Sequence, residues 1–143
     1  MSDIYIVGFD GTEASGRAAD LAAGLAKTSG ATLHLVLVLE WSPYSFLSQE
    51  ELAERHKRRE EELVRAAAVV EPVAAKYGAM GITTTHEVRY GHAGEIIAEI
   101  ASSSGAKQIF VGRQGSRKLT DRLLGGLTMA LVQIATVPVT VVP

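Results

Sequence analysis

The chain has 143 residues, of which 47% are hydrophobic and 21% charged, with a formal net charge of -2 and no cysteine. This length and apolar content predict one globular domain, residues 1–143, because such a chain buries about 70% of its unfolded surface. The absence of cysteine excludes disulfides and thiolate metal sites. The slight negative charge argues against general nucleic-acid binding. No apolar run reaches the ~20 residues that span a bilayer, so we expect no transmembrane helix.

Strand and helix patterns alternate along the chain. Apolar segments with the period of a strand lie at residues 4–9, 32–39, 82–88, 107–112 and 137–142. Patterns with the period of a helix lie between them, at residues 13–29, 48–77, 93–104 and 126–135. Five strands alternating with four helices predict a single-domain, doubly wound α/β fold, in which a parallel sheet is covered by helices on both faces.

The first predicted helix is rich in alanine and has a clear end. Its period places Ala18, Leu21, Ala22 and Leu25 on one apolar face, and Gly30 follows directly as a C-terminal stop signal. The sequence therefore predicts that this face packs on the sheet.

The second predicted helix is highly charged. Ser48 can cap its start with Glu51 three residues later, and charges of both signs alternate around Leu52 and Leu63. We interpret this pattern as a solvent-exposed face, with docking of an unidentified regulatory protein as the alternative. The aromatic cluster of Trp41, Tyr44 and Phe46 before the helix can lie under a loop or cover a ligand.

Candidate binding residues follow two of the predicted strands. Asp10 comes directly after the first strand, and Gly112 ends the fourth and opens a glycine pattern that continues with Gly115 and, after nine residues, Gly125 and Gly126. In an open parallel sheet, ligands bind beyond the carboxyl ends of the strands where the strand order reverses. Glycines let backbone N–H groups approach an anion, and the intervening loop adds Arg113, Arg117, Lys118 and Arg122.

Several other chemistries fit the sequence poorly. The glycine pattern is not a P-loop, because no Lys-Ser or Lys-Thr pair follows it, and the dinucleotide fingerprint belongs after the first strand. The four histidines lack metal-binding spacing, so we predict no metal site among them. A receiver domain needs a partnered acidic cluster and a lysine near the last strands, whereas Lys107 precedes its strand here. Ser116 has no histidine and carboxylate pattern beside it.

These residues resemble those of universal stress protein domains, over nearly the whole chain from IVGFDGTEAS to VPVTVV. The signature of that family is G-x-x-G, nine residues, then G followed by Ser or Thr, between the fourth strand and the last helix. The resemblance implies a Rossmann-like fold of the adenine nucleotide alpha-hydrolase type with strand order 3-2-1-4-5. It also implies a stress-response module that binds ATP, with Mg²⁺ as a possible companion and no catalytic residue.

The resemblance also implies a set of nucleotide-binding residues. Asp10 matches the acidic residue near the nucleotide, the backbone of Val38 matches the group that contacts adenine, and Thr128 matches a late hydroxyl position. The full set comprises Gly8, Phe9, Asp10, Val38, Val111, Gly112, Arg113, Gly115, Gly125, Gly126, Leu127 and Thr128.

Gly126 departs from the family signature, which has Ser or Thr at that position. Loss of one hydroxyl bond to a charged phosphate weakens binding by about 1.5 to 3 kcal/mol if nothing replaces it. Two alternatives therefore stay open beside ATP binding: a nucleotide-free member that acts through protein contacts, and a slow ATPase.

Assembly and location are further expectations. The order 3-2-1-4-5 leaves the last strand at an edge, and members of the resembling family commonly pair there, so we expect a homodimer through residues 137–142. The start MSDIYIVGFD lacks the basic and apolar segments of a secretion signal, so we expect a cytoplasmic protein with no membrane or nucleic-acid partner.

Overall fold

The computed structural model describes residues 3–40, 49–113 and 126–143. Within these ranges strands and helices alternate as the sequence predicts. The strands are β1 (Ile4–Gly8), β2 (Thr32–Glu40), β3 (Thr84–Gly91), β4 (Gln108–Gly112) and β5 (Val139–Val142). The helices are α1 (Glu13–Ser29), α2 (Gln49–Ala79), α3 (Ala93–Ser104) and α4 (Gly126–Ile134).

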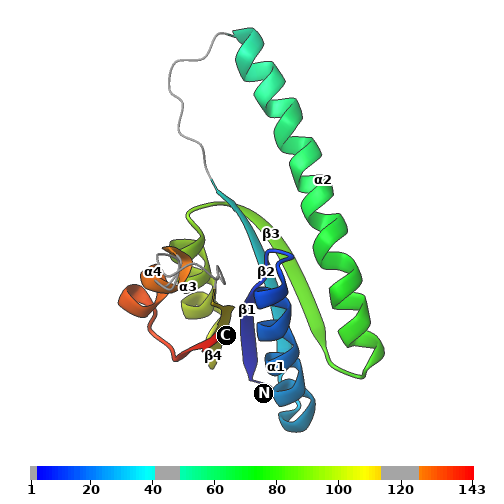
Figure 1. The fold of residues 1–143 in the computed structure, drawn as a ribbon, viewed down its shortest axis with the longest axis vertical. Coiled ribbons are helices and arrows are strands. Elements are labelled where there is room, and N and C mark those ends of the chain that lie inside the picture. Colours follow the sequence, from blue (N-terminus) through cyan, green and yellow to red (C-terminus); the bar gives the residue numbers. More distant parts are fainter. Residues whose placement is uncertain (1–2, 41–48, 114–125) are drawn as a thin grey trace.

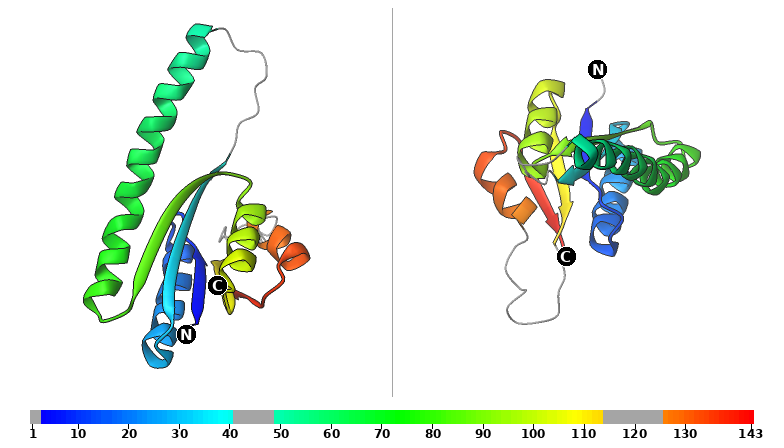
Figure 2. Two further views of the ribbon diagram at one scale, coloured as in Figure 1. Left: turned by 180° about the vertical axis from the view of Figure 1, so that it is seen from behind. Right: turned by 90° about the horizontal axis from the view of Figure 1, so that it is seen from above.

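The five strands form one parallel sheet in the order β3-β2-β1-β4-β5. Helices α1 and α2 cover one face of the sheet, and α3 and α4 cover the other (Figures 1 and 2). The predicted doubly wound α/β fold with strand order 3-2-1-4-5 is therefore confirmed.

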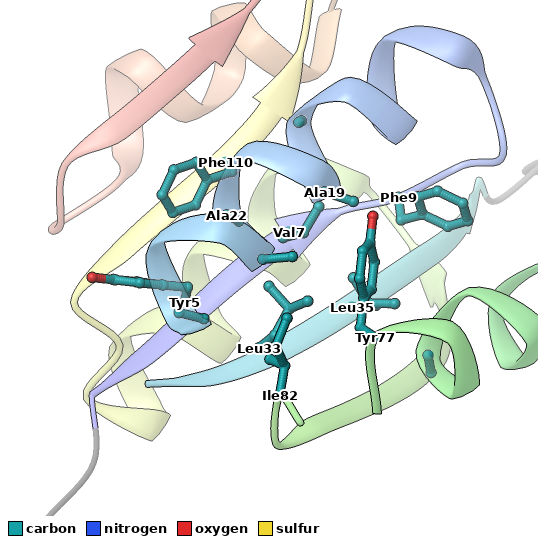
Figure 3. Packing of buried hydrophobic residues seen from close by; sticks show 14 of the residues in the cluster. Tyr5, Val7, Phe9, Ala19, Ala22, Leu33, Leu35, Tyr77, Ile82 and Phe110 are labelled. Carbon is teal, nitrogen blue, oxygen red and sulfur yellow. The ribbon is translucent and has the colours of Figure 1, made fainter. Parts of the chain in front are cut away.

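Two apolar clusters fill the space between the sheet and its helices. On the α1 and α2 face, Leu33 and Leu35 of β2 pack with Tyr77 of α2, and Tyr5 and Phe110 meet edge to face with ring centroids 5.4 Å apart (Figure 3). On the opposite face the alternate strand residues, among them Ile6 and Ile109, pack against α3 and α4. This alternation follows from the two-residue period of a strand.

The buried face of α1 differs from the prediction. The bounds of the helix are as expected, and Gly30 caps its end with a φ of 79° and an N–H bond to Ala26. The helix buries alanines, Ala18 and Ala22 included, whereas Leu21 and Leu25 are exposed. A helix that presents only Cβ atoms lies closer to the sheet than leucines would permit, which moves the contact line away from them.

Strand β3 starts two residues later and ends three residues later than predicted. Ile82 is buried before the strand begins, and its carbonyl accepts a bond from the Thr84 hydroxyl at 3.0 Å. Because β2 extends to Glu40, it offers β3 pairing partners as far as Gly91. The length of β3 is therefore set by its neighbour, which local sequence does not encode.

Helix α2 runs well beyond the sheet (Figure 1). Its second half packs on the core from Ala66 onward, while Leu52 and most of the first half are exposed, as expected for a charged helix. Tyr90 of β3 holds the first half of α2 near the sheet, since its hydroxyl donates to Glu62 at 2.7 Å and its ring lies 5.4 Å from the Arg59 guanidinium carbon. The predicted cap Ser48 lies outside the described residues.

No helix in residues 3–40, 49–113 and 126–143 combines the length and the hydropathy of a membrane span.

Candidate functional site

The carboxyl ends of β1 and β4 lie side by side at the point where the strand order reverses. Gly8, the last residue of β1, is paired with Val111, which lies one residue before the end of β4. The chain leaves β1 for α1 on one face, whereas α4, which follows β4, lies on the other. This edge is the position where open parallel sheets bind ligands.

Asp10 forms the centre of a capping network at the start of α1. Its Oδ1 accepts the backbone N–H of Thr12 at 3.0 Å and the Thr12 hydroxyl at 2.6 Å. Thr12 in turn accepts the N–H of Ser15 at 3.3 Å, and the buried Ser15 hydroxyl donates to the Thr12 carbonyl at 2.9 Å. Sequence reading missed Thr12 and Ser15, although Thr followed three residues later by Ser at a helix start is a capping pattern.

The environment of Asp10 favours its charged form. Partial burial raises the pKa of the carboxyl group, but the hydrogen bonds from Thr12 and Ser15 outweigh burial and hold the pKa below its ordinary value. Asp10 is therefore a fixed negative charge whose hydrogen-bonding capacity is partly used within the loop.

Gly112 has a packing role that its sequence context did not reveal. A Cβ at this position would lie 2.7 Å from the backbone nitrogen of Ser15 and still closer to the carbonyl group of Ala14. The end of β4 therefore passes against the first turn of α1, and only glycine fits there. Gly11 is also restricted to glycine, because its φ is 84° and an added Cβ would lie 2.9 Å from the Val69 side chain of α2.

The predicted apolar site residues lie on different faces of the sheet. The Cβ position of Gly8 is 3.2 Å from Val111 and 3.5 Å from Leu127, which brings these three residues together on the α3 and α4 face. Val38 packs on the same face, whereas the Phe9 side chain is buried on the opposite face under α1. Phe9 can therefore offer a ligand only its backbone.

The start of α4 contrasts with the other helix starts. An added Cβ at Gly126 meets no described atom within 4 Å, and Thr128 is buried in the same turn. Among the four described helices, α4 is the one without an acidic residue in its first turn. The acidic residues of the others are Glu13 in α1, Glu50 and Glu51 in α2, and Glu95 in α3. The positive end of α4 is thus the one best suited to an anion.

The remaining predicted residues are only partly described. Arg113 is exposed just after β4, and its N–H donates to the carbonyl of Val142 at 2.7 Å. Gly115, Gly125 and the basic residues between them lie outside the described residues. Within the described ranges no group of three or more His, Cys, Asp or Glu side chains could hold a metal ion.

Comparisons with known proteins converge on one family. The sequence model described as "Universal stress protein family" matches residues 1–143. A search of curated protein sequences finds no match.

Three solved structures illustrate the likeness, all below 25% identity, so they bear on the fold alone. A universal stress protein family member from Burkholderia pseudomallei is 20% identical, with a TM-score of 0.72 over 99% of this chain and 96% of that one. A universal stress protein in complex with cAMP is 21% identical, with a TM-score of 0.71 over 99% and 96%. The Archaeoglobus fulgidus universal stress protein in complex with dAMP is 15% identical, with a TM-score of 0.60 over 100% and 98%.

Proposed function

The chain belongs to the universal stress protein family, and we propose that it is a regulatory module that binds ATP at the carboxyl edge between β1 and β4. Solved relatives described as complexes with cAMP and dAMP support an adenine nucleotide as the ligand. The site residues would be Asp10, the backbone of Val38, Gly112 and the first turn of α4.

The observation that carries this proposal is the charge pattern at the edge. A triphosphate is repelled by Asp10 and Glu13 at the start of α1 and attracted by the acid-free start of α4. Exposed Arg113 adds a cation on the β4 side. The phosphates would therefore lie towards α4, which leaves adenine towards β2 and Val38.

Mg²⁺ would bind together with the phosphates of the nucleotide. The described residues offer no metal-binding cluster, and Asp10 already accepts two bonds from Thr12. Mg²⁺ commonly binds through nucleotide phosphates and water with few protein ligands, which suits such an edge. We assign no catalytic residue, because Asp10, the carboxylate that follows β1, is engaged in capping, and any ATP hydrolysis would be slow.

A nucleotide-free member that acts through protein contacts is the second candidate, and Gly126 favours it. This residue lacks the hydroxyl of the family signature, and the open space around it offers no described replacement. The two candidates differ in whether the folded chain gains stability from ATP.

The deciding experiment is thermal unfolding with Mg²⁺ and ATP, with AMP, GTP and Mg²⁺ alone as controls. At 100 times its dissociation constant, ATP should stabilise the fold by about 2.7 kcal/mol, or roughly 5 to 10 °C for this chain length. AMP should protect less if the outer phosphates are bound, and GTP should not protect. An unchanged melting temperature at millimolar ATP would favour the nucleotide-free candidate.

We also propose a homodimer through β5. This edge strand has three valines among its four residues, and exposed side chains flank it on both faces. On one face Arg17 of α1 donates to the carbonyl of Pro143, and Leu21 and Leu25 follow one and two turns later on the same side of the helix. On the other face Met129 and Val132 of α4 are exposed. A partner strand would cover these groups together with the unpaired edge.

Light scattering of the parent chain and of Val141→Pro tests the dimer, since proline removes a backbone donor from the edge. Leu21→Glu should also weaken it without touching the strand. A parent that is monomeric at tens of micromolar, or variants that associate as tightly as the parent, would exclude this interface.

A further inference from the structure

A row of four polar side chains lies on the face of β2 and β3 that α2 does not cover. His34 of β2 is paired in register with Thr85 of β3 and points away from the Leu33 and Leu35 side. Its Nδ1 lies 2.6 Å from the Thr85 hydroxyl, and its Nε2 lies 2.9 Å from Oε2 of Glu87. Arg89 donates to the other Glu87 oxygen at 3.0 Å.

The proton positions in this row follow from the chemistry of its ends. An ionised carboxylate only accepts hydrogen bonds, so Nε2 of His34 must carry a hydrogen and donate it to Glu87. In the neutral imidazole, Nδ1 is then the acceptor, and the Thr85 hydroxyl donates to it. The arrangement is a hydroxyl, a base and a carboxylate that orients the base, in the order that activates a nucleophile.

Exposure in the row suits a reactive hydroxyl. The His34 side chain is only 15% exposed and the Glu87 side chain 31% exposed, so the base is largely shielded. Thr85 itself is exposed near the start of the edge strand, where a small molecule can reach it.

The row is separate from the proposed nucleotide site. His34 lies four residues before Val38 along β2, a separation of about 13 Å in an extended strand. Reactivity at Thr85 therefore does not depend on whether the chain binds ATP.

We propose that Thr85 is an activated hydroxyl that accepts an acyl group from activated acyl donors, such as thioesters and aryl esters. The Thr85 oxygen attacks the carbonyl carbon while its proton passes to Nδ1 of His34. The bond from that carbon to the leaving sulfur or oxygen breaks, and the leaving group takes the proton from His34. The products are an ester on Thr85 and a free thiol or phenol, with Glu87 holding the imidazole in place throughout.

The test treats the full chain with p-nitrophenyl acetate and measures acetylation of individual residues by peptide mass spectrometry. Thr84 is the internal control, because its hydroxyl donates to the Ile82 carbonyl and makes no hydrogen bond to an imidazole within the described residues. A positioned general base contributes about 100-fold or more, so Thr85 should react at least about 100 times faster than Thr84.

Variants separate activation from simple exposure. His34→Gln should lower acetylation of residue 85 by about 100-fold, Thr85→Val should abolish it, and Thr85→Ser should retain it. Thr84→Val should leave it unchanged, and melting temperatures would confirm that each variant folds. Equal reactivity of Thr85 and Thr84 in the parent, or full reactivity in a folded His34→Gln variant, would overturn the proposal.

Discussion

The start of α1 and the start of α4 meet the same edge of the sheet with opposite chemistry. At α1, Asp10 and Thr12 use each other as hydrogen-bond partners, and Gly112 packs against the helix backbone. At α4, Gly126 has open space around it among the described atoms, and no acidic residue stands in the first turn. One side of the candidate site is thus fixed by the fold, and the other is available to a ligand.

This contrast changes how a glycine beside a ligand site is interpreted. Gly112 and Gly126 belong to the same sequence pattern, yet the first is required for packing and the second is free of contacts with described atoms. Substitutions on the α1 side should therefore act on stability, and substitutions on the α4 side should act on binding.

The largest effect is expected for Gly112→Ala. The added methyl would collide with backbone atoms of Ala14 and Ser15, which move only if α1 moves. We expect a loss of about 3 kcal/mol or more in the free energy of unfolding, measured by urea denaturation. Gly126→Ala is the matched control and should change stability by no more than about 1 kcal/mol. Equal losses of unfolding free energy in Gly112→Ala and Gly126→Ala would contradict the proposed difference between the starts of α1 and α4.

The next effect concerns binding and comes from Gly126→Ser. The new hydroxyl restores the family signature and has space among the described atoms. It should tighten ATP by about 1.5 to 3 kcal/mol, roughly 10- to 150-fold, in titration calorimetry. Gly126→Ala controls for the backbone change, since it adds a carbon without a hydrogen-bonding group. If serine and alanine give the same affinity, α4 does not hold the phosphates.

A smaller effect is expected for Thr12→Ala, which removes the side-chain cap of α1. The loss should be about 1 kcal/mol in the free energy of unfolding, as for other N-cap residues. Thr28→Ala is a control in the last turn of the same helix, where the hydroxyl only bonds back to the Gly24 carbonyl at 3.2 Å. A larger loss for Thr28→Ala than for Thr12→Ala would argue against the capping network.

The smallest effect is a pH dependence that Asp10 contributes. Because the folded state lowers the pKa of this carboxyl group, its charged form stabilises the fold above the unfolded pKa, and that stability is lost as pH falls through the folded pKa. The parent should therefore lose stability relative to Asp10→Asn below about pH 4, with a constant difference near neutral pH. Urea denaturation of the parent and of Asp10→Asn, below about pH 4 and near neutral pH, measures this change in relative stability. If the stability advantage of the parent over Asp10→Asn grew in acid, the assignment would be contradicted.

Much of the fold was predictable because its signals are local. The bounds of α1 follow from a helical period that ends at Gly30, and the edge position of Asp10 and Gly112 follows from the strand pattern. The strand order followed from the resemblance, since periodicity does not say which strands are neighbours. The extent of β3 depended on β2, a tertiary relation that its own residues do not carry.

The chemistry of the site was less predictable than its position. The burial of Ala18 and Ala22 in place of Leu21 and Leu25 depends on how closely α1 approaches the sheet. The same close approach of α1 to the sheet gives Gly112 its packing role. The distance between α1 and the sheet therefore explains both the buried alanines and the packing of Gly112. The ligand-binding roles inferred for Gly115 and Gly125 stay predictions, because these residues lie outside the described ranges.

The length of α2 has a consequence for how the molecule rotates in solution. Its 31 residues extend about 46 Å, roughly three times the radius of gyration of a compact domain of this size. The helix lies close to the long axis of the molecule (Figure 1), and the N–H bonds of a helix are nearly parallel to its own axis. Rotational diffusion should therefore be anisotropic, with slower effective tumbling for amides of the packed half of α2 than for amides directed across the sheet.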